Sequence, residues 1–228
     1  MNDLPFEAII FDMDGTLIDT ESADFRACQM LYEELGMTLL LNEWAKKIVG
    51  STDGYHHLFE ELARQSNDGL TPDNLWQRIR QLWQVTFQDI GLMPGVESLL
   101  PKLQTAGYSL GLASASDREW VNRWLTHFNL NPYFQVIATG DDITHNKPAP
   151  DIFLFAATQL QVDPKRCLVF EDTAQGVMAA KSAGMTVIAV PNLVTKTLDF
   201  SRADEVTDGL ENVTIEWLQQ LGNCSIRH

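Results

Sequence analysis

Five short apolar segments limit the fold of this 228-residue chain more than any other feature. They lie at residues 8–11, 108–113, 136–139, 167–170 and 186–190. Most of the stretches between them carry apolar residues at helical spacing; Val96, Leu99, Leu100 and Leu103 are an example, and Gly107 is expected to end that helix. Strands that alternate with helices are typical of a parallel sheet with crossover helices. The sequence therefore predicts a doubly wound α/β fold.

Residues 20–90 interrupt this alternation, because they contain apolar stripes at helical spacing and no convincing strand. The two clearest stripes are Phe25, Cys28, Leu31, Tyr32 and Leu35, and Leu75, Ile79, Leu82 and Val85. Residues 50–54 are expected to form a loop between helices. We therefore expect a Rossmann-like core domain of residues 1–19 and 91–228, with residues 20–90 inserted as a helical domain.

Composition and charge exclude several classes of protein. The chain has 31 acidic and 16 basic residues, a formal net charge of -15, so nucleic acid polymers and anionic membranes are poor partners. Its three cysteines (Cys28, Cys167 and Cys224) form no C-x-x-C pair, which predicts reduced thiols in the cytoplasm and no zinc site. We expect no signal peptide and no membrane span. A monomer is the simplest expectation.

Polar side chains directly follow the first, second and fourth predicted strands, and a lysine lies in the loop after the third. These residues are Asp12 and Asp14, then Ser114, then Lys147, then Glu171 and Asp172. Because parallel strands share one direction, such groups should gather at the carboxyl edge of the sheet, where open α/β sheets bind ligands. The sequence therefore predicts a polar site at this edge.

The residue types indicate the chemistry of that site. Gathered carboxylates repel one another and favour a hard divalent cation such as magnesium. Magnesium, a lysine and a hydroxyl together suit a phosphoryl group, which carries nearly two negative charges. A carboxylate can attack phosphorus, and a second carboxyl can donate a proton to the leaving group and later accept one from water. Asp12 and Asp14 suit these two tasks.

The motifs taken together resemble those of haloacid-dehalogenase-superfamily phosphohydrolases that have a helical cap domain after the first strand. The resemblance rests on the sequence from Asp12 to Thr16, on Ser114 at its strand end, on Lys147 followed by Pro148, and on the pair Glu171–Asp172. It extends over essentially the whole chain. It also implies that the cap closes over the site and selects the substrate.

The resemblance implies a role for each motif residue. Asp12 would be the nucleophile and a magnesium ligand, and Asp14 would be the acid/base whose backbone carbonyl also faces the metal. The other implied roles are phosphoryl binding by Ser114 and Lys147, and magnesium binding by Asp172 and by Glu171, the latter directly or through water. Further candidates for contact with the substrate or cap are Ala115, Arg118, Gly50 and Ser51.

Asp14 favours phosphoester chemistry, because the dehalogenases and phosphonate hydrolases of the superfamily lack an acid at that position. The predicted activity is magnesium-dependent hydrolysis of a small phosphorylated metabolite, a sugar phosphate or nucleotide-like monoester, through an aspartyl-phosphate. Relatives of this kind include sugar-phosphate phosphatases, pseudouridine-5'-phosphatases and β-phosphoglucomutases.

Two alternatives stay open at this point. A phosphosugar mutase would hold a second phosphate with a cap arginine and histidine, but the corresponding positions here are Asp53 and Asp24. Acidic residues at these positions count against a bisphosphate intermediate. A non-catalytic phospho-acceptor module would also use an acidic cluster with lysine and hydroxyl, but it needs no helical insertion.

Other residues have structural explanations. Residues 116–119 fit a capping box, so Ser116 is predicted to cap a helix rather than to bind a ligand. The six tryptophans fall mostly on helical faces and are predicted to pack there. None of the five histidines is assigned to a metal.

Overall fold

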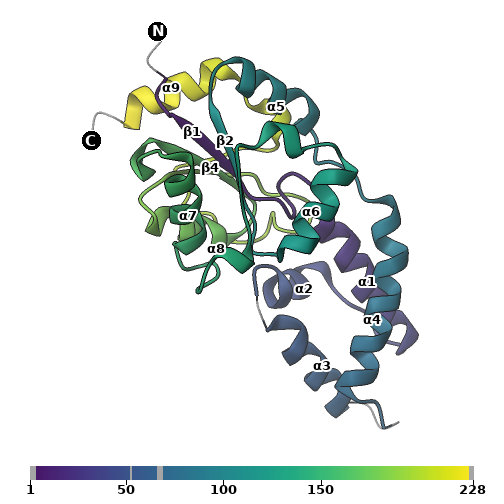
Figure 1. The fold of residues 1–228 in the computed structure, drawn as a ribbon. Coiled ribbons are helices and arrows are strands. Elements are labelled where there is room, and N and C mark those ends of the chain that lie inside the picture. Colours follow the sequence, from purple (N-terminus) through teal and green to yellow (C-terminus); the bar gives the residue numbers. More distant parts are fainter. Residues whose placement is uncertain (1–3, 52, 66–68, 226–228) are drawn as a thin grey trace. The chain divides into compact units, whose positions relative to one another are not determined.

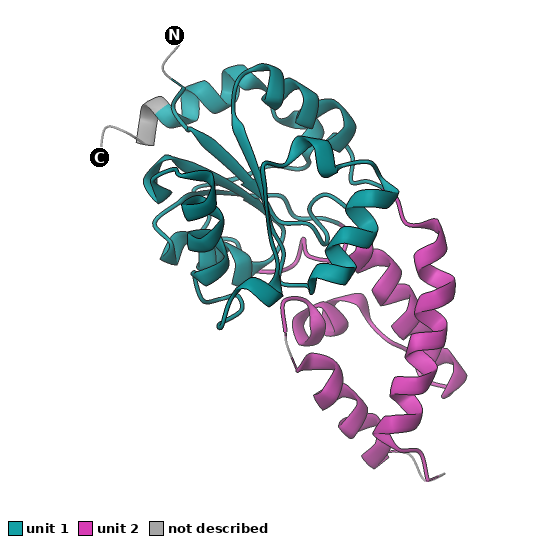
Figure 2. Ribbon diagram, in the orientation of Figure 1, with its two compact units in different colours: residues 1–18, 92–192, 199–228 teal, residues 19–91, 193–198 magenta. Residues whose placement is uncertain are grey.

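The computed structural model describes residues 4–51, 53–65 and 69–225, and the chain divides into two compact units (Figure 2). Unit 1 comprises Met1–Ile18, Leu92–Asn192 and Asp199–His228, and unit 2 comprises Asp19–Gly91 and Leu193–Leu198. Residues 193–198, which were predicted to belong to the core domain, cluster instead with the helical insertion. Within the described ranges, no helix has both the length and the apolar character that crossing a membrane requires.

Unit 1 is built on a six-stranded parallel sheet, which confirms the predicted α/β class (Figure 1). The strands are β1 (Ala8–Phe11), β2 (Ser109–Ala113), β3 (Val136–Ala138), β4 (Cys167–Glu171), β5 (Thr186–Ala189) and β6 (Glu205–Val206), in the spatial order β3-β2-β1-β4-β5-β6. Phe11 pairs with Leu112 on one side and with Phe170 on the other. The residues after β1, β2 and β4 therefore emerge at the same edge.

Helices of unit 1 cover the sheet. They are α5 (Val96–Thr105), α6 (Arg118–His127), α7 (Asp151–Leu160), α8 (Ala174–Ser182) and α9 (Ile215–Ser225). On one face, α7 and α8 pack against alternate strand residues such as Ile10 and Val169, as the two-residue period of a strand requires (Figure 1). Phe11 stacks on Phe170 at a centroid distance of 5.0 Å. This packing fixes β1 and β4 side by side directly before their polar ends.

The five predicted strands are present, and the structure adds a sixth. The extra strand, β6, contains only two residues, both exposed, so its sequence carries no apolar run that could have revealed it. Gly107 ends α5 as predicted, because its φ of 92° is a left-handed conformation that a residue with a side chain adopts only with strain.

Unit 2 is helical, as predicted for the insertion. Its helices are α1 (Thr20–Glu34), α2 (Leu41–Ile48), α3 (Gly54–Gln65) and α4 (Pro72–Thr86). Their apolar faces meet in one buried cluster that includes Cys28 and Leu31 of α1, Trp44 of α2, Phe59 of α3 and Ile79 of α4. The unit therefore has its own core.

Two expectations for unit 2 were wrong in detail. Val85 is 57% exposed, because Thr86, four residues after Leu82, takes the next buried position of the α4 stripe. Gly54 belongs to α3 rather than to a loop, and a Cβ there would lie 2.4 Å from the Lys47 carbonyl oxygen. Thr52, in the same predicted loop, lies outside the described residues.

Candidate active site

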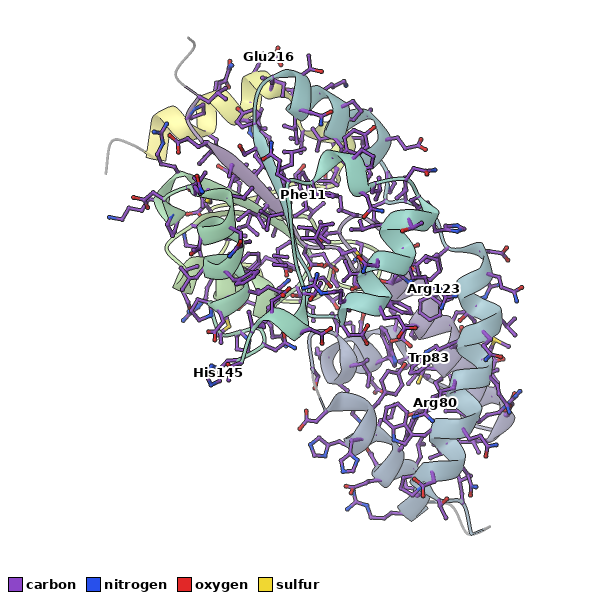
Figure 3. All side chains as sticks on the ribbon, viewed as in Figure 1. Phe11, Arg80, Trp83, Arg123, His145 and Glu216 are labelled. Carbon is purple, nitrogen blue, oxygen red and sulfur yellow. The ribbon has the colours of Figure 1, made fainter. Side chains whose placement is uncertain are left out.

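The turn after β1 presents two aspartates at the carboxyl edge of the sheet. Phe11, labelled in Figure 3, is the last residue of β1, and the Asp12 backbone N–H continues the ladder by donating to the Phe170 carbonyl at 3.0 Å. The chain then turns at Gly15, whose φ is 78°. A Cβ on Gly15 would lie 2.3 Å from the Asp172 Oδ2 atom. Glycine therefore permits both the turn and its close approach to Asp172.

Lys147 joins the ends of β1 and β4. Its Nζ donates to Asp12 Oδ1 and, at 2.6 Å, to Glu171 Oε1. All three side chains are buried, with 8% or less of each exposed. Burial opposes the charge on the amine, yet the carboxylates of Asp12 and Glu171 raise the pKa of Lys147 above the usual lysine value. Lys147 is therefore a buried cation held between two acids.

Opposing effects act on the ionisation of Asp12. Burial raises the pKa of Asp12 well above its usual value. Lys147 opposes this shift, whereas the negative charges of Glu171 and Asp14 add to it. Additional positive charge at this position would therefore stabilise the ionised form of Asp12.

Glu171 is bound tightly by the protein. Its Oε2 accepts hydrogen bonds from the backbone N–H of Thr173 at 2.7 Å and from the Thr173 hydroxyl at 2.9 Å. A Cβ at position 176 would lie 1.7 Å from Glu171 Oε1, so a larger residue there would displace this carboxylate. The cap of α8 is Thr173, whose Oγ1 accepts from the Gly176 N–H at 3.0 Å. Glu171 therefore serves mainly as the partner of Lys147 rather than as a helix cap.

Asp172 is fully buried and is oriented by Thr16, a motif residue to which no role was assigned, and by Asn192, which was not predicted. Thr16 Oγ1 donates to its Oδ1 at 3.1 Å, and Asn192 Nδ2 donates to its Oδ2 at 2.8 Å. Asn192 Nδ2 also donates to the Gly15 carbonyl at 3.0 Å. Asn192 follows β5, so the rule that polar groups after parallel strands gather at one edge could have found it.

The Asp14 carboxylate accepts hydrogen bonds from three uncharged donors. Ser114 and Ser116 donate from their hydroxyls to Oδ2 at 3.2 and 2.9 Å, and the Trp120 indole donates to Oδ1 at 2.9 Å. Two predictions are corrected here. The N-cap of α6 is Asp117, which accepts from the Trp120 backbone N–H at 2.8 Å, and Ser116 binds Asp14 instead. Trp120 likewise hydrogen-bonds to a site residue, and its role is not packing alone.

The remaining candidate contacts lie in both units. Ala115 is exposed, and its carbonyl accepts from Asn146 Nδ2 at 3.3 Å. Arg118 pairs with Asp142 through its guanidinium. Ser51 donates to Asp53 Oδ1 at 3.0 Å between α2 and α3, directly after Gly50. Contact of these residues with a substrate stays a prediction.

The donor set of the site fits a hard divalent cation. The single charge of Lys147 is shared by two carboxylates, which leaves a surplus of negative charge on hard oxygen ligands. Within the described part of the chain, no three His, Cys, Asp or Glu side chains are arranged to hold a metal ion. The resemblance implies the carboxylates of Asp12 and Asp172 and the Asp14 carbonyl as ligands, with Glu171 ligating directly or through water. Magnesium bound by few protein oxygens keeps several water ligands.

Comparison with known proteins places the chain in a family. The model of the haloacid dehalogenase-like hydrolase family matches residues 9–190. YhcW of Bacillus subtilis, which is named as a phosphatase, is 38% identical over 212 residues, covering 93% of this chain and 96% of its own. Hexitol phosphatase B of Escherichia coli K12 is 33% identical over 186 residues, covering 81% and 83%.

Solved structures agree with this assignment. A haloacid-dehalogenase-family hydrolase from Deinococcus radiodurans, with bound phosphate and sodium, matches with a TM-score of 0.78 and 27% identity over 98% of this chain and 97% of its own. A β-phosphoglucomutase from Clostridium difficile matches with a TM-score of 0.73 and 27% identity over 98% and 100%. The chain belongs to the haloacid dehalogenase-like hydrolase family and is an enzyme, which confirms the resemblance seen in the sequence.

Proposed function

We propose that the enzyme is a magnesium-dependent phosphatase that hydrolyses a small phosphorylated metabolite, a sugar phosphate or nucleotide-like monoester, through an aspartyl-phosphate on Asp12. The observation that carries this proposal is the buried contact between Lys147 Nζ and Asp12 Oδ1 at the end of β1. The lysine orients the nucleophile and offsets the repulsion between a carboxylate and an approaching phosphate. The names of YhcW and hexitol phosphatase B support the same reaction class.

The proposed reaction has two steps, formation of the aspartyl-phosphate and its hydrolysis. In the first, an Asp12 oxygen attacks phosphorus, the bond to the leaving oxygen breaks, and Asp14 gives its proton to that oxygen. In the second, water attacks the phosphorus and loses a proton to Asp14, and the bond to Asp12 breaks. Each turnover consumes one water, releases an alcohol and inorganic phosphate, and restores both aspartates.

The other site residues support these steps. Ser114 and Lys147 would bind the oxygens of the transferring phosphoryl group. Magnesium would be held by Asp12, the Asp14 carbonyl and Asp172, with Glu171 ligating directly or through water, and when bound it supplies charge that neutralises those oxygens. The hydrogen bonds from Thr16 and Asn192 would keep Asp172 aimed at the metal, as the partners of metal ligands commonly do.

Replacement of the nucleophile tests the proposal. Asp12→Asn is expected to abolish release of phosphate from p-nitrophenyl phosphate, because an amide does not form the aspartyl-phosphate. Asp208→Asn, an exposed aspartate of the same unit, is the matched control and should retain full activity. EDTA should also remove activity, and magnesium should restore it. Undiminished turnover by a folded Asp12→Asn enzyme would overturn the proposal.

The substrate class calls for a separate measurement. Phosphate release should be assayed with magnesium across sugar phosphates, sugar-alcohol phosphates and nucleotides, and we expect one of these groups to stand out in kcat/KM. A mutase would instead convert a hexose 1-phosphate to the 6-phosphate when a catalytic bisphosphate is supplied, which NMR detects. A long-lived phosphoprotein without repeated turnover would indicate a phospho-acceptor module.

A further inference from the structure

The acid/base Asp14 is held through both carboxylate oxygens, and the two oxygens have different kinds of partner. Oδ1 receives the Trp120 indole N–H at 2.9 Å. Oδ2 receives the hydroxyls of Ser116 at 2.9 Å and Ser114 at 3.2 Å. An indole N–H is a donor only, whereas a serine hydroxyl donates or accepts. If Asp14 carries its proton on Oδ2, a serine hydroxyl can accept that proton in a hydrogen bond. A proton on Oδ1 would face the indole N–H, which cannot accept it.

We infer that Trp120 is a positioning residue that holds Asp14 Oδ1 as an acceptor, so that the proton transferred in each step is carried by Oδ2. This inference rests on the proposed function. During the first step the proton passes from Oδ2 to the leaving oxygen, and during the second step it passes from the attacking water back to Oδ2. Ser114, the predicted phosphoryl-binding hydroxyl, lies beside that same oxygen.

The surroundings of Trp120 suit a residue that must hold its position. Its backbone N–H donates to the Asp117 cap at the start of α6. Its ring packs in a T-shaped arrangement on Trp124, with centroids 5.5 Å apart, and Trp124 is only 3% exposed. Tryptophan has two side-chain torsions, so one backbone anchor and one ring contact restrict the indole strongly. General acids act only when aimed within hydrogen-bond reach of the reacting oxygen.

Trp120→Phe removes the N–H and retains an aromatic ring, and two substrates separate a positioning role from a structural one. The leaving group of β-glycerophosphate is an alkoxide, which requires a proton. The leaving group of 2,4-dinitrophenyl phosphate is 2,4-dinitrophenolate, a stable anion that requires none. We expect kcat/KM for β-glycerophosphate to fall about tenfold or more, as part of the 10²- to 10⁴-fold contribution typical of general acid catalysis. For 2,4-dinitrophenyl phosphate, kcat/KM should change by less than about twofold, while kcat falls because Asp14 must still activate water.

The control is Trp217→Phe, a half-buried tryptophan on α9. On α9, Gly222 lies so close to Pro5 that a Cβ would be 1.9 Å from the Pro5 Cβ, which places this helix near the start of β1 and away from the site. The control should leave the ratio of the two kcat/KM values unchanged. Equal losses of kcat/KM on both substrates in Trp120→Phe, or no loss on either, would overturn the inference.

A second variant tests the assignment of the proton to Oδ2 if Trp120→Phe does not fold. Ser116→Ala removes a donor to Oδ2, and it should lower kcat/KM selectively for β-glycerophosphate, while Ser116→Thr, which keeps the hydroxyl, should restore it. Loss on both substrates in Ser116→Ala, or failure of Ser116→Thr to restore, would count against the assignment of the proton to Oδ2. If Asp12→Asn keeps full turnover, the proposed function itself fails; if Asp12→Asn is inactive and Trp120→Phe is unselective, only the role of Trp120 fails.

Discussion

The two aspartates of the β1 turn are two residues apart and have different hydrogen-bond partners. Asp12 is buried against a charged lysine that it shares with Glu171. Asp14 is half-buried, and its carboxylate receives two serine hydroxyls and one indole N–H. Lys147 opposes the effect of burial and so favours the ionised form of Asp12. A serine hydroxyl can donate a hydrogen bond to a carboxylate or accept one from a protonated carboxyl. The difference suits a nucleophile at Asp12 and an acid/base at Asp14.

Removal of the charge on Lys147 should cause the largest loss of stability and activity, because this charge is the buried cation that contacts Asp12. Lys147→Met leaves Asp12 and Glu171 buried without their shared cation, and breaking a buried pair in this way costs about 3–5 kcal/mol. Urea denaturation should show that loss of stability, and phosphate release should fall by about 10² or more, as when a charge-stabilising donor is removed from an active site. Lys181→Met, which breaks a half-exposed pair with Asp204, is the control and should cost about 1 kcal/mol or less. Similar effects of the two variants would contradict a special role for Lys147.

A methyl group added at Gly176 should disturb the contacts of Lys147 with Asp12 and Glu171 without removing any polar group. Its Cβ would lie 1.7 Å from Glu171 Oε1, the oxygen that accepts from Lys147, so this contact must shift. Gly176→Ala should therefore lower kcat by about 10- to 100-fold, since misplacement by about 1 Å can cost 10² in rate. Gly91→Ala, where a Cβ meets nothing within 4 Å, should keep wild-type kinetics. Normal activity in Gly176→Ala would show that the position of Glu171 is unimportant.

The smallest expected effect concerns Arg118, which lies between the Asp14 donors Ser116 and Trp120 in the sequence. The side chain of Arg118 is 46% exposed and pairs with Asp142, and such exposed pairs contribute about 0.2–1 kcal/mol. If the Arg118 side chain does no more than pair with Asp142, Arg118→Gln should change kcat/KM by less than about twofold. A rise in KM with unchanged kcat would instead support the predicted contact between Arg118 and substrate, and steady-state kinetics on the preferred substrate separates the two results.

The residues predicted to gather around Asp12 could be found in the sequence because strand ends of a parallel sheet share one edge; their catalytic roles stay predictions. Asp12, Lys147, Glu171 and Asp172 follow or join such ends, and the structure brings Lys147 to two of them. Asn192 obeys the same rule after β5, but a single amide without a carboxylate neighbour offers a weaker signal.

Two of the residues that donate to Asp14, Ser116 and Trp120, were not predicted to do so, because they lie at the start of a helix rather than at the end of a strand. Residues 116–119 matched a capping box, and the cap lies one residue later, at Asp117. That shift of one position frees the Ser116 hydroxyl for Asp14 and points the Trp120 side chain to the same carboxylate. Local pattern alone does not distinguish a capping serine from a serine that binds a distant group.

Periodicity and strand-end chemistry, both local properties of the chain, determined the α/β class, the helical insertion and the two aspartates of the β1 turn. The tertiary structure decided how those aspartates differ. Partners of Asp12 and Asp14 lie 100 or more residues away in the chain, with Lys147 135 residues from Asp12 and Trp120 106 residues from Asp14. Which donor reaches which oxygen depends on helix packing and on the exact residue where α6 begins, and only the folded chain brings these together.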